Sequence, residues 1–505
     1  MNFNKNTTLL FLFFSGVMLT SCEKFFDVND DPANVKEAPI ENILPSVTVN
    51  VGYLGGSDLF RYGNLIVQQF SGQTTNTSRT FVDYERYFIT NSDVNNQWSS
   101  IYATILADIA QLIPQAEKNN SPHYAGVARL LKSYVYQLTV DAWGDVPYSE
   151  ASKFGTNLYP KYDDDEMIYK DLIKTIDSAI VNLNEPVSVF EPNQNTTIYA
   201  GKWSDVKNNW IKFANTLKLR IYIHYTKKDP AFAASQITAL VNSGAAFMTS
   251  NADNFKMNFL AEAARQNPNT SIEGGQFRNS FFPNRFIVNL MNDRADPRRP
   301  IYFVPFPYNS SPATYKGASV LDNSSVAYSR LNTFLKGDAV VGNVVVNVDR
   351  TITDASIKWS GNAPTRLLTF AEYNFIRSEA ALVLNAPGDA QQFFEAGIRA
   401  SMNETQVSTA NANTYISARG TLTGTTAQKL EQIINEKYVA NFGVVMEPWN
   451  DWRRTGYPTI QPLPLSAAVY DKIPTILVYP LSETSSNPNT PARDNMLQRV
   501  FWDVR

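Results

Sequence analysis

The stretch Ser121–Trp143, SPHYAGVARLLKSYVYQLTVDAW, decides the fold class of this chain. Apolar residues recur in it at intervals of three and four, which is the period of an amphipathic α-helix. They are Tyr124, Val127, Ala128, Leu131, Tyr134, Val135, Leu138 and Trp143. Ser121-Pro122 suits a helix start, because proline fits the first turn. The same period runs from Trp98 to Ile113, so we expect two antiparallel helices joined by a short turn.

Working outward, the helical period returns in five more segments. They are residues 163–183, 203–225, 369–384, 390–402 and 426–442. Pro114 lies near the end of the helix that begins at Trp98 and favours a kink or a stop there. Helix pairs repeating every 30 to 45 residues or so are typical of tetratricopeptide-like stacking, although the strict repeat motif is not met. We therefore predict a mainly α fold, a tetratricopeptide-like superhelix of helix pairs.

The helical period fades over residues 51–97, 245–365 and 456–500, where Asn, Ser, Pro and aromatic residues are frequent. Long loops in an ordered domain are usually functional. We expect these three segments to form a loop-rich cap, with a few short β-hairpins, that serves as the binding layer. The helical scaffold would lie at about 98–226 and 366–443, within one domain spanning 51–505. One hairpin is expected at Val340–Val345, turning at Gly342-Asn343.

The first 22 residues, MNFNKNTTLLFLFFSGVMLTSC, have the pattern of an export signal. Lys5 gives a positive start, and the apolar run Leu9–Leu19 is too short to span a bilayer, which takes about 20 residues. The segment ends at Cys22, the only cysteine in the chain. Leu-Thr-Ser-Cys resembles the lipobox of bacterial lipoproteins, in which the cysteine is acylated. We predict a signal peptide at 1–21, lipidation at Cys22 and an extended lipidated tether over 22–50.

Charge and composition exclude several functions. The chain has 44 Lys+Arg against 47 Asp+Glu and lacks a basic tract, so nothing favours nucleic acid. The chain has only His123, His224 and one lipidated cysteine, which are too few ligands for a His/Cys zinc site. Neither histidine lies in the catalytic signature of a serine triad. Asp163-Asp164-Asp165 is interpreted as a helix N-terminus rather than a calcium loop. We predict no enzyme activity, no metal site, no cofactor, and structural or surface roles for both histidines.

Five stretches, in order along the chain, resemble the SusD/RagB family of outer-membrane nutrient-binding lipoproteins. They are SCEKFFDVNDDP from Ser21, DAWGDVPYSEA from Asp141, WIKFANTLKLR from Trp210, TFAE and RSEA from Thr369 and Arg377, and EKY with WNDWRRTGYP from Glu436 and Trp449. Any one of these stretches alone is a weak indication of the family, but together they cover nearly the whole chain. The WNDWRRTGYP block resembles one subgroup in particular.

The resemblance implies a function without chemistry and a mainly helical, tetratricopeptide-like fold with a loop-rich cap. Such a protein sits at the outer membrane, lipid-anchored and facing the cell exterior. It captures an oligosaccharide and delivers it to a SusC-like TonB-dependent transporter. An oligopeptide cargo is the first alternative, and a protein that only caps the barrel is another. A secreted glycoside hydrolase is the alternative from a different class; Glu372 and Glu379, seven apart on one helix face, would be its candidate acid pair.

Two of these motif blocks are interpreted as structural. Asp145, in the bend Gly144–Pro147, is expected to bond the backbone at a helix exit. Asp451 stands beside Arg453 and Arg454 with tryptophans near, which predicts an ion-pair lock between aromatic faces. A recognition fork for a ligand is the alternative for that block.

Sugar sites need flat aromatic faces edged by planar polar groups. Loop positions with this chemistry form two sets. The first is Tyr84, Arg86, Tyr87, Asn91 and Trp98; the second is Tyr308, Tyr315, Tyr328 and Trp359. The first set stands slightly ahead, because Tyr84-Glu85-Arg86-Tyr87 brings stacking and hydrogen-bonding groups close in sequence. Packing of loops onto the scaffold is the alternative for each residue.

Overall fold

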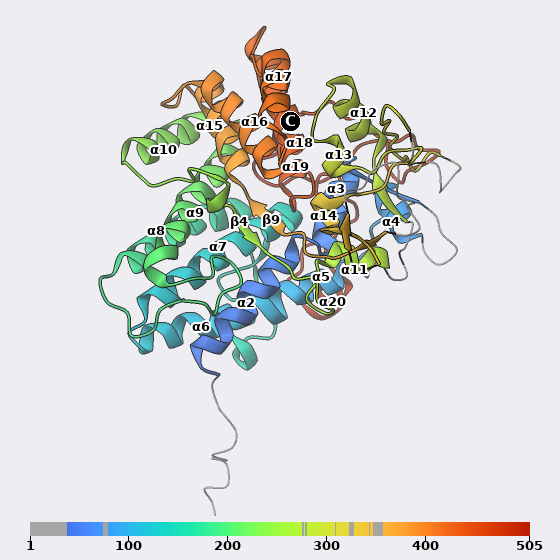
Figure 1. The fold of residues 1–505 in the computed structure, drawn as a ribbon. Helices are drawn as coiled ribbons and strands as arrows, with labels where there is room; N and C mark the ends of the chain where they lie inside the picture. The colour runs from blue at the N-terminus through green and yellow to red at the C-terminus, as the bar shows by residue number, and fades with distance from the viewer. Residues whose placement is uncertain are drawn as a thin grey trace, which may run out of the picture.

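The chain is built mostly from helices that stack on one another, with short strands joining distant segments (Figure 1). This computed structural model describes residues 38–73, 79–274, 277, 280–308, 310–322, 328–342, 344–346 and 357–505. Cys22 and the signal peptide lie outside the described residues, so lipidation stays a prediction.

The first helix group contains the pair expected between residues 98 and 143. It comprises α5 (Asn95–Ser99), a π-helical turn (Ser100–Ile105), α6 (Leu106–Lys118), α7 (Pro122–Trp143), α8 (Asp165–Asn184), α9 (Trp203–His224) and α10 (Pro230–Asn242). α6 continues past Pro114 to Lys118, so the helix does not stop at the proline. Its packing along α7 offsets the hydrogen bond that proline cannot make. Asp164 caps α8 by accepting a hydrogen bond from the Met167 amide at 2.8 Å, as expected for a helix N-terminus.

The second helix group lies in the C-terminal part of the chain. It comprises α15 (Phe370–Leu384), α16 (Ala390–Glu404), α17 (Thr409–Arg419), α18 (Thr426–Ala440) and α19 (Glu447–Thr455). Thr369 caps α15 and Thr425 forms a capping box with Gln428 at the start of α18. α15 packs against α16, α18 and α9, so it joins the two groups.

The N-terminal segment corrects our prediction of an extended tether through residue 50. α2 (Ile40–Leu54) is a helix with Pro45 inside it, followed by α3 (Asp58–Ile66) and α4 (Thr80–Glu85). The buried face of α2 follows the helical period and is made of Ile40, Ile43, Leu44, Val47, Val51 and Leu54. α2 packs against α6 and α7. Residues 40–72 therefore belong to the scaffold, because burying that apolar face outweighs the prolines.

Two strand pairs, β1–β5 and β4–β9, connect segments that are far apart in sequence, and the other pairs are local. β1 (Phe70–Gly72) pairs with β5 (Phe281–Pro283), β2 (Val146–Pro147) with β3 (Tyr162–Asp163), and β4 (Phe255–Met257) with β9 (Thr365–Leu368), all antiparallel. β6 (Ala339–Val341) pairs with β7 (Val344–Val346) and β8 (Lys358–Trp359). The β6–β7 pair is the predicted hairpin; Gly342 has a positive φ of 64° there, and Asn343 lies outside the described residues.

Only short helices occur elsewhere in the described parts of 245–365 and 456–500. They are α11 (Pro268–Gly274), α12 (Arg285–Asp293), α13 (Arg299–Tyr302), α14 (Thr333–Lys336) and α20 (Leu481–Ser486). Single 3₁₀ turns lie at Phe154–Thr156 and Asn251–Asp253. These segments have the loop-rich character that their sequence predicts.

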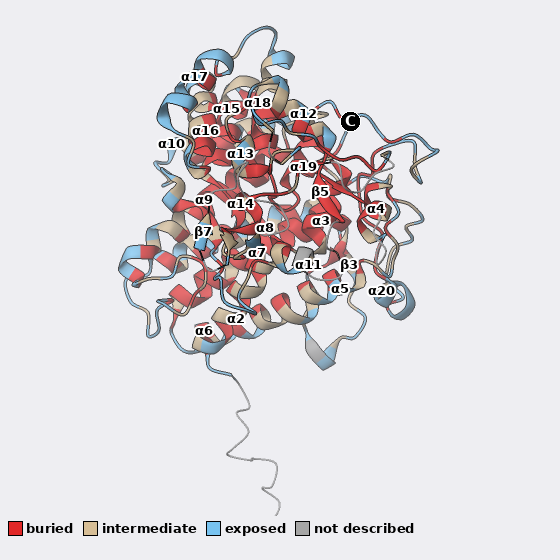
Figure 2. Cartoon of the chain, turned by 45° about the vertical axis from the view of Figure 1, so that its right-hand side comes forward, coloured by how far each residue is buried: buried red, intermediate tan, exposed pale blue. Residues whose placement is uncertain are grey.

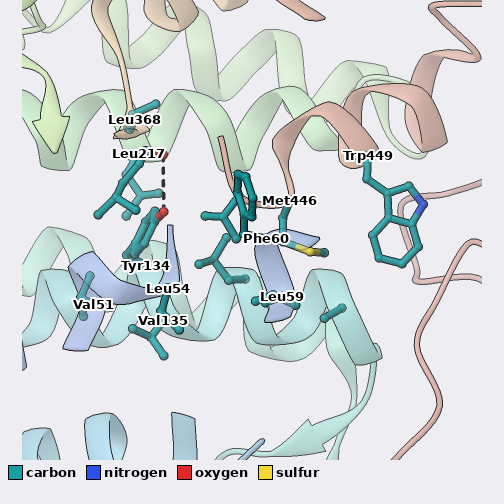
Figure 3. Close-up of a cluster of buried hydrophobic side chains, with 14 of the residues drawn as sticks. Val51, Leu54, Leu59, Phe60, Tyr134, Val135, Leu217, Leu368, Met446 and Trp449 are labelled. Carbon is teal, nitrogen blue, oxygen red and sulfur yellow. Dashed lines mark hydrogen bonds between the residues drawn. The ribbon is translucent and has the colours of Figure 1, made fainter. Parts of the chain in front are cut away.

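The buried residues run along the middle of the helical stack (Figure 2). In Figure 3, side chains of α2, α3, α7 and α9 point toward one another, among them Val51, Phe60, Val135 and Leu217. Met446, just before α19, completes this cluster. α2 and α3 thus share one core with residues of both helix groups.

None of the helices in the described ranges is both long enough and apolar enough to cross a membrane. The mainly α fold, with tetratricopeptide-like helix pairs and a loop-rich cap, is confirmed.

Candidate functional site

The first set of predicted ligand residues packs loops together. Tyr84 is 6% exposed and its hydroxyl donates to Asp93 Oδ1 at 3.3 Å. The Tyr87 hydroxyl accepts from the Leu463 amide at 3.2 Å, and the Trp98 indole donates to Glu483 Oε1 at 3.2 Å. All three rings are buried and covered by protein side chains. They are unavailable for stacking on a ligand in this structure, which corrects the preference for this set.

The two polar members of the first set serve the same loops. Asn91 Nδ2 donates to the Tyr479 carbonyl at 2.5 Å, and the Arg86 carbonyl accepts from the Val469 amide at 3.0 Å. Both bonds hold the 456–500 segment against the scaffold. The loop-packing alternative therefore describes Tyr84, Tyr87, Asn91 and Trp98, whereas a ligand role of the Arg86 side chain stays a prediction.

The second set is divided between three places. Tyr308 and Tyr328 line one cavity. Tyr315 packs against Phe303, with the Arg299 guanidinium 5.4 Å from its ring centroid. Trp359 lies on β8, with Lys336 Nζ 4.2 Å from its ring centroid. Tyr315 and Trp359 are half-buried and stay predictions, separate from the cavity.

The shared hollow, which we call the aromatic cavity, has a volume of about 300 Å³. Phe282, Val304, Pro305, Phe306, Pro307, Tyr308, Tyr328 and Arg330 line it. Phe282 and Tyr328 are buried with their rings edge to face, 6.1 Å between centroids. Phe306 and Tyr308 are half-buried. The cavity thus has an aromatic floor and a partly open aromatic wall.

Backbone pairing between distant segments positions these side chains. The Val304 amide donates to the Arg330 carbonyl at 2.8 Å, and the Phe306 amide donates to the Thr314 carbonyl at 2.8 Å. On the other side, the register of β1 with β5 places Phe282 opposite Ser71. Three chain segments must therefore meet before the cavity exists.

Polar groups edge the aromatic floor. The Arg330 guanidinium lies 5.7 Å from the Phe282 ring centroid, and Lys316 Nζ lies 5.3 Å from that of Tyr328. Burial and the Asp322 carboxylate raise the pKa of Tyr328 to about 12, so its hydroxyl stays protonated at neutral pH. Flat rings with hydroxyl and guanidinium groups around them suit a neutral, hydroxyl-rich ring as ligand.

A second cavity, of about 550 Å³, is larger but chemically less suited. Arg366 covers the Phe334 ring, 3.7 Å from its centroid, and donates from Nε to Glu404 at 2.9 Å. The Phe334 ring and the charged groups of Arg366 and Glu404, which line this second cavity, are thus already in contact with one another. The aromatic cavity is the better candidate site.

Sequence reasoning missed Phe282, Phe306 and Arg330. No local pattern indicates them, because Ser280–Pro283 (SFFP) and Tyr328–Arg330 (YSR) lack the alternation of apolar and polar residues that predicts a strand. That these two segments meet could not be read from the local pattern.

The family-like motifs form a buried ion network. Arg220 donates to Glu372 Oε1 and Oε2 at 2.7 and 2.8 Å, and both side chains are fully buried. Arg454 pairs with Glu379 and, at 2.6 Å, with Asp451. Each glutamate thus has its own arginine inside the core, away from any cleft. These contacts speak against the glycosidase pair and against the recognition fork, and they support the predicted lock.

Other members of the network are equally enclosed. Lys437 Nζ lies 3.0 Å from both Glu447 and Asp451. Burial opposes ionisation of Glu447, but Lys437 and Arg220 hold the pKa of that carboxyl well below its usual range. These charges are compensated by one another, as buried ions must be.

Aromatic rings close the network at one side. The Arg453 guanidinium lies between Trp449 and Trp502, 4.2 and 4.7 Å from their ring centroids. The Trp502 indole donates to Asp141 Oδ1 at 3.2 Å. His224 is fully buried against Trp502, in line with the structural role predicted for it.

His123 also has a packing role. It is buried, stacks on Trp203 at 4.7 Å between centroids, and its Nε2 lies 2.9 Å from the Glu185 carbonyl. Neither histidine lines the aromatic cavity.

The Gly144–Pro147 bend has the predicted backbone bond. Asp145 Oδ1 accepts from the Asp165 amide at 3.0 Å. Among the described residues, Asp145, Asp164 and Asp165 are the one set of three or more His, Cys, Asp or Glu side chains whose ligand atoms all lie within 4.8 Å of one another. Asp164 caps α8, and Asp165 accepts from the Phe501 amide at 2.8 Å. These bonds account for the cluster without a cation.

The buried Glu85 carboxyl holds together the chain segments next to Phe282 of the aromatic cavity. Its Oε2 accepts from the Ser71 hydroxyl and the Gly72 amide, both at 2.7 Å. Its Oε1 accepts from Asn284 Nδ2 at 3.0 Å and from the Val320 amide at 3.4 Å. Glu85 therefore ties α4 to β1 and to the segments that flank Phe282.

Glu85 should make stability depend on pH. Burial raises the pKa of its carboxyl to about 8, against about 4.3 in an unfolded chain. Between these values the folded state holds a proton that the unfolded state has lost. The unfolding free energy should therefore fall as pH rises from about 4.5 to 8, by at most about 1.4 kcal/mol per pKa unit. Urea unfolding at a series of pH values, followed by tryptophan fluorescence, measures this.

Other groups also titrate, so the difference between variants is the informative quantity. Glu85→Gln should flatten the pH profile in this window, whereas Asp83→Asn on the same helix should leave it as in the wild type. Parallel profiles for the wild type and Glu85→Gln would contradict the assignment.

Comparisons with known proteins come from family models and from solved structures. A model of SusD-like proteins, described as starch-binding and associating with the outer membrane, matches residues 36–480. A chitin-binding SusD homolog from Flavobacterium johnsoniae is similar at 21% identity and TM-score 0.73, covering 92% of this chain and 98% of that one. No curated protein matches the chain by sequence.

Two further solved structures have the same fold. A SusD-like protein from Bacteroides thetaiotaomicron has 22% identity and TM-score 0.72, with coverage of 92% and 99%. A SusD homolog from Bacteroides uniformis has 23% identity and TM-score 0.69, also with coverage of 92% and 99%. Similarity at these identities concerns the fold alone.

Proposed function

Because the chain belongs to the SusD-like family of starch-binding proteins that associate with the outer membrane, we propose that it binds an oligosaccharide in the aromatic cavity. Delivery of that sugar to a SusC-like TonB-dependent transporter is the second part of the proposal. The observation that carries it is the meeting of four aromatic rings and Arg330 in one hollow of about 300 Å³.

The cavity suits one sugar unit of a longer chain. Its volume lies at the lower end of the range for small-molecule sites. The apolar face of a sugar ring would stack on the half-buried rings of Phe306 and Tyr308. Its hydroxyls would meet Arg330 and the hydroxyls of Tyr308 and Tyr328. A few aromatic contacts, about 0.5–1.5 kcal/mol each, give weak binding, which suits a protein that must release its cargo.

The anchor and the location complete the proposal. Acylation of Cys22 would hold the protein at the outer membrane with its body facing the cell exterior. Several acyl chains on one residue make anchoring stable, whereas one chain holds only marginally. The family description supports the outer-membrane location.

The function requires no catalysis. Glu372 and Glu379, the candidate acid pair, are buried and each is paired with an arginine. An oligopeptide cargo is the remaining alternative, and a protein that only caps the barrel would show no soluble ligand at all.

Tyr308→Ala should weaken glycan binding about 2- to 12-fold, the effect of one aromatic contact. Affinity electrophoresis against starch and chitin polymers, with calorimetry on oligosaccharides and peptides, measures it. Tyr159→Ala is the matched control, since Tyr159 is 54% exposed on another loop. Equal affinity of wild type and Tyr308→Ala would remove the site from the cavity. Peptide binding without sugar binding would favour the peptide branch.

A further inference from the structure

A further cavity lies between α6, α7 and the loop that follows β2. It has a volume of about 220 Å³, and we call it the helix-pair cavity. Leu106, Ile109 and Ile113 give it an apolar wall on α6, and α7 contributes Lys132 and Tyr136. It shares no lining residue with the aromatic cavity. It is therefore a separate place on the helical scaffold.

The helix that carries the apolar wall is irregular at both ends of that wall. The π-helical turn Ser100–Ile105 ends directly before Leu106. Pro114, which also lines the cavity, has no amide hydrogen, so the Ala110 carbonyl loses its usual helical partner. Irregular turns of the π type are frequent at functional sites. The cavity thus lies where α6 departs from regular helix geometry.

Tyr136 brings a hydroxyl without a partner into this apolar space. Its side chain is 2% exposed, and its hydroxyl forms no hydrogen bond with any residue that the structure describes. Its ring packs edge to face on that of Tyr148, 4.7 Å between centroids, and the Tyr148 hydroxyl donates to Asp171 Oδ2 at 2.6 Å. Buried hydroxyls in native proteins nearly always have a partner. A ligand in the helix-pair cavity would supply one for Tyr136.

Lys132 lies one turn before Tyr136 on α7. Its Nζ is 4.8 Å from the ring centroid of Tyr148 and 5.9 Å from that of Tyr136, and it forms neither a hydrogen bond nor an ion pair within the described ranges. Burial lowers the pKa of the Lys132 amine; Asp171 on α8 offsets this only in part, and Arg129 on α7 adds to it. The positive charge in the cavity is thus incompletely compensated.

We propose that the helix-pair cavity binds a small monocarboxylic acid with an aromatic or branched apolar body. The carboxylate accepts hydrogen bonds from Lys132 Nζ and from the Tyr136 hydroxyl. The apolar body lies against Leu106, Ile109 and Ile113. The volume suits one six-membered ring with a small substituent, since an apolar cavity of about 150 Å³ already holds benzene. This site goes beyond the proposed function and does not depend on the sugar site.

Benzoate is the probe for the test. Benzyl alcohol and benzylamine have nearly the same shape but carry a neutral and a cationic group in place of the carboxylate. Calorimetry on the purified protein should show binding of benzoate, binding of benzyl alcohol at least tenfold weaker, and none of benzylamine. Lys132→Met and Tyr136→Phe should each weaken benzoate binding about tenfold, as expected for a hydrogen bond to a charged group.

Matched controls separate the site from the rest of the surface. Lys170→Met on α8 and Tyr159→Phe alter side chains that are 55% and 54% exposed, and both should leave benzoate affinity unchanged. Tyr136→Phe removes only an oxygen without a partner, so its melting temperature should equal or exceed that of the wild type.

Three results would each overturn the proposal: no benzoate binding by the wild type, equal affinity for benzoate and benzyl alcohol, or unchanged benzoate affinity in Lys132→Met. Starch and chitin binding is measured separately on the same samples. The sugar proposal and this one therefore fail independently.

Discussion

Arg454→Ala should destabilise the protein by about 3–5 kcal/mol, because it leaves buried carboxylates without their partner. Arg454 is 2% exposed and pairs with Glu379 and Asp451 inside the core. Removing one member of such a pair costs far more than the pair contributes. A loss of this size is a large part of the stability of a typical domain. Urea unfolding and thermal melting of purified protein measure it.

Two variants make this test specific. Arg399→Ala removes an exposed ion pair with Glu395, 3.0 Å long, and should cost less than about 1 kcal/mol. Arg454→Met combined with Glu379→Gln should recover part of the loss, since it removes charge from both sides. An Arg454→Ala protein as stable as the Arg399→Ala control would show that the network is not an essential lock.

Cys22→Ala should move the protein from the membrane fraction to the soluble fraction. Each buried methylene contributes about 0.8 kcal/mol, so losing every acyl chain removes the anchor outright. Fractionation of cells, with incorporation of labelled palmitate, measures both the location and the modification. Full retention, with palmitate still incorporated, would show that another residue carries the lipid.

The helices were predictable where their buried face is apolar. α7 and α9 follow the 3.6-residue period closely, and both match the predicted ranges. α2 was missed because the turn formers that precede it, from Asp27 to Pro39, suggest an extended segment. α19 was missed for a different reason: its buried face is WNDWRR, which carries charge instead of an apolar stripe.

The candidate site was only partly predictable. Tyr308 and Tyr328 could be selected by chemistry, but Phe282 joins them only through pairing of β1 with β5. Trp98 and Tyr84 were selected by the same chemistry, but the structure buries both rings between loops. A ring that stacks on a ligand and a ring that fastens a loop look alike in sequence, and only the folded structure shows which of them lines a cavity.

The bond between Trp502 and Asp141 joins residues 361 positions apart. Arg453 and His224 both lie against the Trp502 ring, so this tryptophan covers one buried charged group and one buried polar group. During synthesis, the ribosome releases residue 141 long before residue 502, so a nascent chain has a core with one wall missing. Its compact state should therefore form late, after nearly all of the chain has emerged. The predicted signal peptide would require an unfolded chain to be threaded through a narrow channel, and such a delay would keep the chain in that state.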